Sequence, residues 1–530
     1  MRRWNGWGDV TTDFPLTPMA LAFLAERIGP GRPRPDATRA VALAAVPPAR
    51  GRFGAGWRTD AEARLDHARG QSFPDWIAMK SGRFGPVADA VGCPETAADA
   101  ESMLREALAL GATVVPYGGG TSVVGHLAIP ASDRPVVNIA LAGLNRLTGF
   151  DPHHRLATFG AGVSGPALEA QLRPHGYLLG HYPQSFEYST VGGWVVTRSS
   201  GQQSYRYGRI EQLFHGGRLL TPQGPLQVGT VPASSAGPDL REMVLGSEGR
   251  LGLLTEVMVR VRPRPAQEHF HGVFFPHWDA ALDAVRMIGQ SEIPLSMLRL
   301  SNELETETQL RLAGHEKLMA WLQRYLGLRG IGDGQCLLMM GITGTLAQCR
   351  RSLREAMVIS RRCGGVHVGK AMGQGWARNR FRGPYLRNTL WQAGYGADTV
   401  ETCVPWSQAT PVMRALERTA HDCFAQRNER GHAFTHLSHV YPQGCSIYST
   451  FVFPSAGDPD ADLAAWQSLK AALSATIVAH GGTISHQHGV GVDHAPYLPQ
   501  EKGPQGMALL RAAAAALDPE GRMNPGKLLT

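Results

Sequence analysis

Long apolar segments are absent from this sequence of 530 residues. It contains no run of 18 or more apolar residues, and no apolar stretch follows the basic start Met1-Arg2-Arg3. A membrane-spanning helix needs about 20 mostly apolar residues, and a secretory signal needs an apolar segment behind its positive charges. We therefore expect neither a transmembrane helix nor a signal peptide.

Runs of like charge are also absent, although the formal net charge is +8. The basic residues are spread along the chain and are not interleaved with aromatic residues. This distribution argues against a nucleic-acid partner. A mildly basic surface suits anionic substrates or the rim of an anionic membrane.

Cysteine is sparse and shows no paired spacing. Seven cysteines are scattered along the chain, and none forms a Cys-x-x-Cys pair. An odd number without such spacing favours free thiols in a reduced, cytoplasmic compartment. With 43% hydrophobic and 18% charged residues, this length predicts a globular protein of two or three packed lobes.

The first clear pattern of secondary structure starts near residue 84, after Pro/Gly-rich stretches that predict an irregular, partly helical N-terminal lobe over 1–83. Thr96 is placed to cap a helix over 97–110, and Gly111 to end it. Short strands are expected at 113–115 and 136–140. This order is typical of an α+β nucleotide-binding domain, which we place at 84–264.

Later segments continue the α+β pattern. A helix starts after Ser164 and ends at Gly176, and 253–261 alternates as a half-buried strand until Pro263. We expect a second α+β domain, a cap, over 265–480, with helices near 278–290, 345–363, 409–430 and 461–480. The C-terminal segment 481–530 contains a further expected helix at 501–515.

A glycine loop follows the first strand of the nucleotide-binding pattern. It reads Pro116-Tyr117-Gly118-Gly119-Gly120-Thr121-Ser122. Consecutive glycines let the backbone approach a ligand and point several N–H groups at one spot, which suits a pyrophosphate. The alternative is a plain tight turn. The loop is neither a Rossmann nor a Walker A motif, because their glycine, lysine and hydroxyl spacings are missing.

Two further glycine turns strengthen the pyrophosphate interpretation. The second contains Ser189, Thr190, Gly192, Gly193 and Trp194. The third contains Glu248, Gly249 and Gly252, immediately before the alternating strand. Three such turns in this order are much less expected by chance than any one of them. Together they favour a bound nucleotide cofactor.

Residues 84–264, with these three turns, resemble the FAD domain of the vanillyl-alcohol-oxidase/p-cresol-methylhydroxylase (PCMH) family. The resemblance implies a two-subdomain FAD-binding domain of PCMH type, an α+β cap, and a C-terminal segment that returns to the FAD domain. The first loop would hold the pyrophosphate, and the other two would line the flavin and adenine ends. Many members bond the flavin to a histidine where this chain has Gly120, so we expect non-covalent FAD.

Longer motifs are similar to the alkyldihydroxyacetonephosphate synthase family within that group. They lie at 4–8, 116–125, 180–194, 297–300 and 485–491. The resemblance implies exchange of the acyl group of an acyl-dihydroxyacetone phosphate for a fatty alcohol, a non-redox step of ether-lipid synthesis. The flavin N5 would hold the C1 carbon during the exchange.

The same resemblance implies roles for individual side chains. Tyr448 would act as acid and base, and Arg299 would hold the substrate phosphate. His181, His486 and His488 would contact substrate oxygens or the leaving carboxylate. The alternative for Tyr448 is an ordinary packing role in its strand. The alternative for Arg299 is a buried structural ion pair. If the segment 485–489 were a strand, His486 and His488 would face the same side.

Two positions depart from the family pattern. The family has three successive histidines where this chain has His486-Gln487-His488, and an arginine where this chain has His436, a second candidate for substrate binding. The change at 436 weakens the case for a phosphate-bearing substrate. Four arginines of the cap could bind the phosphate in place of the missing arginine, although clustered arginines are most often solvated. They are Arg378, Arg380, Arg382 and Arg387.

The main alternative function is an FAD-dependent dehydrogenase or oxidase acting on a 2-hydroxy acid or alcohol; a flavin-binding protein without turnover is a third. The metal-binding dehydrogenases have a glutamate where this chain has Gln487, so we expect no metal. We also expect a lipid-like or phosphate-bearing small-molecule substrate and a homodimer. The expected location is the cytoplasm, with peripheral contact at a membrane surface.

Overall fold

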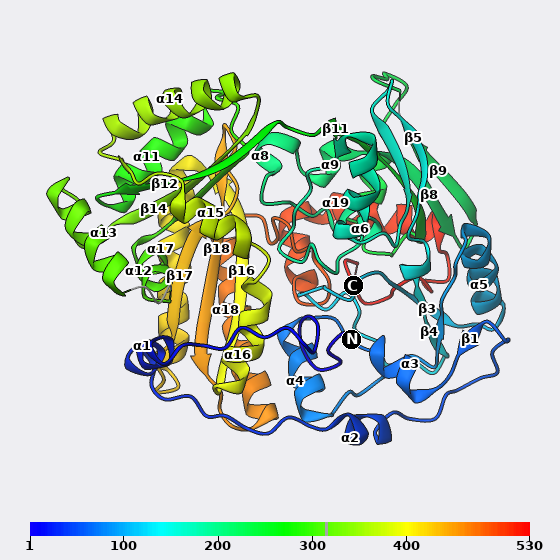
Figure 1. Cartoon of the computed structure of the whole chain (residues 1–530). Coiled ribbons are helices and arrows are strands. Elements are labelled where there is room, and N and C mark those ends of the chain that lie inside the picture. Colours follow the sequence, from blue (N-terminus) through cyan, green and yellow to red (C-terminus); the bar gives the residue numbers. More distant parts are fainter. Residues whose placement is uncertain (230, 313–315, 530) are drawn as a thin grey trace.

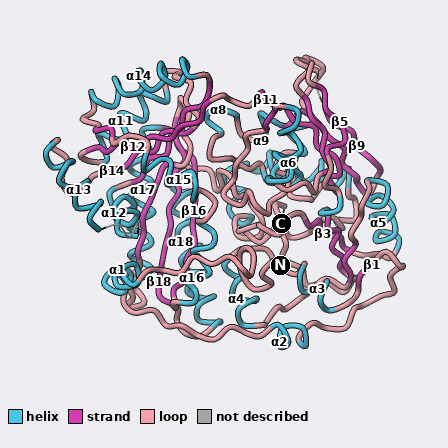
Figure 2. Tube along the Cα trace, in the orientation of Figure 1, coloured by secondary structure: helices cyan, strands magenta, loops and turns pink. Residues whose placement is uncertain are grey.

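The computed structural model describes residues 1–229, 231–312 and 316–529. Two halves lie side by side, each built around its own β-sheets (Figure 1). The cap strands and their helices form the left half in this view, and the strands near the glycine loop form the right half. Loops fill much of the space between the halves (Figure 2). The α+β class expected from the sequence is confirmed.

A four-stranded sheet carries the glycine loop. Its order is β1 (Trp57–Arg58), β2 (Ala90–Gly92), β4 (Val136–Ala140) and β3 (Thr113–Tyr117), with the last three strands parallel. Helix α5 (Ala97–Ala109) begins with a capping box in which Thr96 and Asp99 bond each other's backbone N–H groups. Strand β3 then runs directly into Gly118. The helix and both strands expected here are confirmed.

A second, antiparallel sheet stands beside the first. Its order is β5 (Leu147–Asp151), β6 (Leu156–Gly160), β10 (Leu253–Arg260), β8 (Phe214–Thr221) and β9 (Gly224–Gly229). In β10 the side chains of Val257 and Val259 are buried, whereas those of Met258 and Arg260 are half-buried. The expected half-buried strand is therefore confirmed. Nearby, β7 (Tyr177–Leu178) pairs with β11 (Arg262–Pro263).

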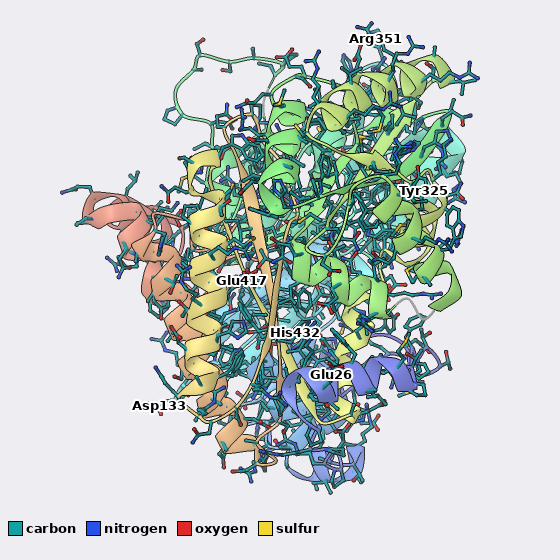
Figure 3. The ribbon with its side chains drawn as sticks, turned by 90° about the vertical axis from the view of Figure 1, so that its left-hand side faces the viewer. Glu26, Asp133, Tyr325, Arg351, Glu417 and His432 are labelled. Atoms are coloured by element: carbon teal, nitrogen blue, oxygen red, sulfur yellow. The ribbon has the colours of Figure 1, made fainter. Side chains whose placement is uncertain are left out.

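The cap contains a seven-stranded antiparallel sheet. Its order is β15 (Val366–His367), β12 (Gln267–Phe275), β14 (Cys336–Gly344), β13 (Met297–Ser301), β17 (His432–Leu437), β18 (Gly444–Pro454) and β16 (Tyr395–Pro405). Its four expected helices are confirmed as α11 (Trp278–Gly289), α14 (Leu346–Arg362), α17 (Ala409–Ala425) and α18 (Pro459–Ala479). Helix α17 covers one face of the sheet, where Glu417 accepts a hydrogen bond from Thr435 of β17 (Figure 3).

Further helices lie between and around these sheets. They are α6 (Gly165–Leu172), α7 (Val191–Thr197), α8 (Ser204–Tyr207), α9 (Ile210–Leu213), α10 (Arg241–Val244), α12 (Glu303–Leu312), α13 (Glu316–Leu328), α15 (Ala371–Asn379) and α16 (Leu386–Gln392). Gly176 follows a 3₁₀ turn after α6 in the left-handed conformation, as expected for a helix stop.

The first 83 residues extend along both halves of the molecule. Helices α1 (Pro18–Ile28), α2 (Arg39–Ala44) and α3 (Ala61–Asp66) follow the lower edge in Figure 1, and β1 joins the four-stranded sheet. Helix α4 (Phe73–Ser81) enters the core of the cap, where the ring of Phe73 stacks on Trp466 at 5.9 Å. This region connects the two halves through apolar packing.

The C-terminal segment returns to the four-stranded sheet, as expected. Helix α19 (Leu498–Leu517) begins three residues before the expected start at 501, and it is kinked at Gly503 and Pro504. Beyond it, the backbone N–H of Val114 donates to Arg522 O at 2.9 Å, and the N–H of Asn524 donates to Val114 O at 2.8 Å. The tail therefore lies beside β3.

A short N-terminal loop packs between the two halves. The N–H of Trp7 donates to Asn388 Oδ1, and Asn388 Nδ2 donates to Trp7 O, which ties the loop to α16 of the cap. Arg2 donates to Gly120 O of the glycine loop at 3.3 Å. Gly8 has φ +87°, and a Cβ there would lie 2.1 Å from the ring of Tyr385.

We predict that Gly8→Ala lowers the free energy of unfolding by about 2 kcal/mol more than Gly51→Ala. Both glycines have nearly the same positive φ, but a Cβ at Gly51 meets its nearest neighbour at an ordinary 3.6 Å. The comparison therefore isolates the clash with Tyr385. Urea unfolding of both variants provides the measurement. Equal losses would show that the loop is not packed against Tyr385.

Candidate functional site

The three glycine turns come together around the start of the first loop. A Cβ added at Gly119 would lie 1.9 Å from Tyr188 O, which directly precedes the second turn. A Cβ added at Gly249 in the third turn would lie 2.9 Å from Pro116 Cγ. Both glycines are thus required by close approach of two chain segments.

The glycine loop offers a set of free hydrogen-bond donors. Within the described part of the chain, the backbone N–H groups of Gly118, Gly119, Gly120 and Thr121 make no hydrogen bond. Successive unpaired N–H groups on a glycine loop form a concave site for anions. This donor set fits the diphosphate of a dinucleotide such as FAD.

Most of the polar side chains predicted to contact the cofactor make hydrogen bonds within the protein. Ser189 Oγ accepts from the indole N–H of Trp194 at 2.7 Å, and Thr190 caps α7. Ser122 Oγ lies 2.8 Å from His126 Nδ1. Glu248 accepts from two backbone N–H groups of the C-terminal segment. These side chains shape the site.

The remaining predicted glycines maintain close packing around the loop. A Cβ at Gly192 would lie 2.7 Å from Ala161, and Gly193 donates to Thr190 Oγ1. Gly252 has φ +150°, and a Cβ there would lie 2.4 Å from Leu220 O. The Tyr117 ring is buried beneath the loop.

Tyr448 lies at the centre of a second cluster, formed by cap strands and the C-terminal segment. Its ring stacks on His436 at 4.9 Å, and the His488 ring meets it edge-on at 5.6 Å. Its hydroxyl donates to Thr399 Oγ1 at 3.3 Å. Burial raises the pKa of Tyr448 well above its ordinary value, so the hydroxyl keeps its proton at neutral pH.

Arg299 makes a part-buried ion pair with Glu305. Its Nη2 donates to Glu305 Oε1 at 2.7 Å and lies 3.2 Å from His436 Nδ1. Burial acts to raise the pKa of Glu305, but Arg299 and His436 outweigh it and hold that pKa well below its ordinary value. The guanidinium thus reaches the Tyr448 cluster through His436.

His181 is fully buried and lies apart from Tyr448. Its Nε2 is 2.7 Å from Ser199 Oγ, and its ring packs on Trp194 at 4.8 Å. Burial first, and then Arg209 and His439, lower its pKa to about 3. The ring is therefore neutral, and it contacts Trp194 of the second glycine turn and Ser199, which follows α7.

The segment that carries His486 and His488 is an irregular turn and not a strand. The expectation that a strand would place both side chains on one face therefore does not apply. Two buried carboxylates hold this turn. Glu401 of β16 accepts from the N–H groups of Gln487 and His488 at 2.7 and 2.6 Å. Glu248 accepts from the next part of the turn, at Val490 and Gly491.

Sequence reasoning missed four members of this cluster. Glu401 and Tyr441 lie in the cap, His439 packs its ring on His486 at 4.9 Å, and Arg209 lies near the second glycine turn. Glu401 shares β16 with Asp398, Thr399 and Thr402, so its place in the sequence did not mark it as buried. Arg209 had no local signal. Within the described residues no group of three or more His, Cys, Asp or Glu could hold a metal ion.

The cap arginines proposed as compensation have specific contacts. Arg387 donates to Gln71 O at 2.6 Å and lies 4.5 Å from the ring centre of Trp76. Arg380 lies over Tyr182 at 4.5 Å, and Arg382 over Phe14 at 4.3 Å. These three side chains are therefore packed on aromatic rings at the contact between cap, N-terminal region and FAD-side loops.

Two family models match the chain. FAD linked oxidases, C-terminal domain, matches residues 264–528, and FAD binding domain matches residues 88–229. A solved p-cresol methylhydroxylase superposes with a TM-score of 0.68 over 89% of this chain and 93% of that one, at 15% identity, which shows the fold alone. The chain belongs to the FAD-linked oxidases, with a PCMH-type FAD-binding domain and a C-terminal cap.

Within this family the chain is alkyldihydroxyacetonephosphate synthase-like. The Dictyostelium discoideum enzyme of that name is 30% identical over 479 residues, 89% of this chain and 78% of that protein. A solved alkyldihydroxyacetonephosphate synthase superposes with a TM-score of 0.85 at 26% identity, covering 99% of this chain and 98% of that one. Relatives also include a mitochondrial cytochrome-linked D-lactate dehydrogenase of Arabidopsis thaliana, 23% identical over 84% of this chain and 74% of that protein.

These findings make the protein an FAD-linked enzyme. Within the described residues no helix is long and apolar enough to cross a membrane.

The buried histidines of the site predict a dependence of stability on pH. Burial lowers the pKa of His439 to about 4, with Arg209 adding to the effect, whereas an unfolded histidine titrates near 6.5. Between these values the unfolded chain binds more protons, so stability is full above about pH 6.5 and falls as pH decreases toward 4. The single residue contributes up to about 3 kcal/mol to this fall.

Thermal unfolding between pH 4 and 8 measures this effect. His439 Nε2 lies 2.9 Å from Gly201 O, a contact that glutamine can reproduce as a donor. We expect His439→Gln to unfold at a lower temperature at pH 7 but to lose less on acidification than the wild type. An unchanged slope would contradict the buried, neutral state of His439.

Proposed function

We propose that this enzyme exchanges the acyl group of an acyl-dihydroxyacetone phosphate for a fatty alcohol. FAD, when bound, supplies an electron-rich ring nitrogen as nucleophile. The observation that carries the proposal is the meeting of Tyr448, His436 and His488 from separate stretches of the chain in one partly buried cluster. The likeness to alkyldihydroxyacetonephosphate synthases over 89% of the chain supports it.

The side chains have distinct tasks in this proposal. The Tyr448 hydroxyl remains protonated at neutral pH, so it can donate to the acyloxy oxygen that leaves C1. His488 lies beside that ring and is placed to exchange a proton with the substrate. His436 and Arg299 supply positive charge or hydrogen bonds near the phosphate end. His486 and His181 maintain the shape of the site.

Non-covalent FAD binding is part of the proposal. Gly120 occupies the place where many family members carry the flavin-linked histidine. Its φ is +63°, and a Cβ there would lie 2.1 Å from Tyr117 Oη. A side chain at 120 would therefore be strained and crowded. We further propose a homodimer in the cytoplasm that takes its lipid-like substrates at a membrane surface.

The first test of the function is an anaerobic exchange assay. Purified protein with hexadecanoyl-dihydroxyacetone phosphate and hexadecanol is expected to release hexadecanoate and form the 1-alkyl ether, with the flavin spectrum still oxidised at the end. Oxygen is not needed, because the exchange has no net redox change. Bleaching of the flavin by D-lactate or D-2-hydroxyglutarate, without ether formation, would identify a dehydrogenase and overturn the proposal.

Tyr448→Phe is expected to slow the exchange by about 10²–10⁴-fold with FAD still bound, because it removes only the proton donor. Tyr395→Phe is the matched control: Tyr395 is another buried tyrosine of the cap sheet, and its hydroxyl donates to Gly29 O at 2.9 Å. That variant should lose stability and keep its rate. Comparable rates in the wild type and Tyr448→Phe would remove the assigned role.

Acid precipitation tests the mode of flavin binding. We expect all the yellow colour in the supernatant, because no side chain at 120 is available for a bond to the flavin. The released cofactor should have the mass of FAD. Colour that stays with the pellet would contradict non-covalent binding.

A further inference from the structure

Arg209 is a largely buried arginine, with 14% of its side chain exposed, and its guanidinium points at His486. Its Nη1 lies 2.7 Å from His486 Nε2, and its Nη2 donates to His486 O at 2.8 Å. Nη1 also donates to the hydroxyl of Tyr441 at 3.2 Å, and Nε lies 2.7 Å from Glu211. The guanidinium is thus held in place from several sides, and its position relative to His486 is defined.

This contact determines which ring nitrogen of His486 carries the proton. A guanidinium has only donors and stays charged in proteins, so Nε2 must accept from it. The Tyr441 hydroxyl, 2.6 Å from the same nitrogen, is also able to donate. His486 is therefore neutral, with its proton on Nδ1. Protonation of Nε2 would place two positive groups within 2.7 Å of each other.

Glu401 faces the Nδ1 atoms of both histidines. The distances are 3.8 Å from its Oε2 to His486 and 3.5 Å from its Oε1 to His488. A carboxylate accepts hydrogen bonds, so it favours the Nδ1–H form of each ring. Nε2 of His486 is then occupied by Arg209, and its Nδ1 is buried at 3.8 Å from the carboxylate, whereas Nε2 of His488 has no partner within the described chain. The side chain of His488 is 18% exposed, against 2% for His486.

We propose that Arg209 and Glu401 are positioning residues that give the two histidines different roles. Arg209 fixes His486 as a neutral ring that does not exchange protons, and Glu401 orients His488 so that its Nε2 is the base of the pair. This inference rests on the proposed function for its catalytic consequence. The tautomer of His486 is independent of any substrate.

The charges around the two rings agree with this division. His486 faces Arg209, His439 and His488, and burial together with these groups lowers its pKa well below the ordinary value. His488 faces Glu401, Lys470, Asp398 and His126, and its ring touches Tyr448. Burial lowers the pKa of His488 as well, but Glu401 opposes that effect and stabilises its protonated form.

The first test observes the His486 ring directly in the flavin-loaded protein. The protein is labelled with ¹⁵N-histidine, and His486→Asn assigns the signals of residue 486 in a two-bond ¹H–¹⁵N spectrum. We expect a protonated Nδ1 and an unprotonated Nε2 that do not titrate between pH 5 and 9. A proton on Nε2, or titration within this range, would overturn the proposal even if no substrate were known.

Variants at position 209 distinguish the effect of the Arg209–His486 hydrogen bond from the effect of burial on the His486 ring. In Arg209→Met we expect His486 to mix tautomers or titrate, and in Arg209→Lys, which can still donate to Nε2, we expect the wild-type pattern. Arg64→Met is the control, because Arg64 is even less exposed than Arg209 but bonds only the carbonyls of Ala88 and Pro47. It should leave the His486 signals unchanged. A wild-type pattern in Arg209→Met would contradict the role of Arg209.

Glu401→Gln tests the role of His488 through the pH profile of the exchange. Removing the negative charge makes protonated His488 less stable, so the acid limb of kcat/KM should move about one pH unit lower, with kcat reduced 10–100-fold. Glu248→Gln loosens the same turn without changing the charge next to His488, and its acid limb should not move. The same acid limb of kcat/KM in the wild type and Glu401→Gln would refute the role of Glu401 in positioning His488. No exchange activity in the wild type would contradict only the proposed function.

Discussion

Two buried carboxylates hold one turn of the C-terminal segment, and the arrangement of the site depends on them. Glu401 comes from the cap and Glu248 from the FAD-binding half, and together they accept four backbone N–H groups between residues 487 and 491. Hydrogen bonds to a charged acceptor are about twice as strong as neutral ones, and burial strengthens them. The two halves are therefore connected at the point where the histidines stand.

This connection explains how remote parts of the chain form one site. The same turn carries His488 to the ring of Tyr448 and His486 to Arg209, while Glu248 also lies 3.0 Å from His126 beside the glycine loop. Backbone N–H groups satisfy both carboxylates, which limits the cost of burying them. The cofactor loop and the reacting side chains are thus fixed relative to each other by electrostatics as well as by apolar packing.

Local patterns in the sequence predicted the helix caps, helix ends and strands that depend only on neighbouring residues. The capping box at Thr96, the glycine stops at 111 and 176, and the alternation in β10 all follow from neighbouring residues, and all are present. The resemblance to a known family supplied Tyr448 and the histidines. Neither revealed Arg209 or Glu401, because their partners lie 277 and about 86 residues away and leave no periodic signal. The backbone of the histidine segment could not be read from its neighbours for the same reason: it is a turn held by distant carboxylates.

The central claim is that this assembly substitutes the oxygen at C1 of its substrate and does not transfer an acyl group or electrons. Hexadecanol labelled with ¹⁸O on its hydroxyl tests it most directly. Substitution at C1 places the label in the ether oxygen, and the released hexadecanoate contains none. Label recovered in a hexadecyl ester would show acyl transfer to the alcohol, and an unlabelled or absent ether would contradict the account.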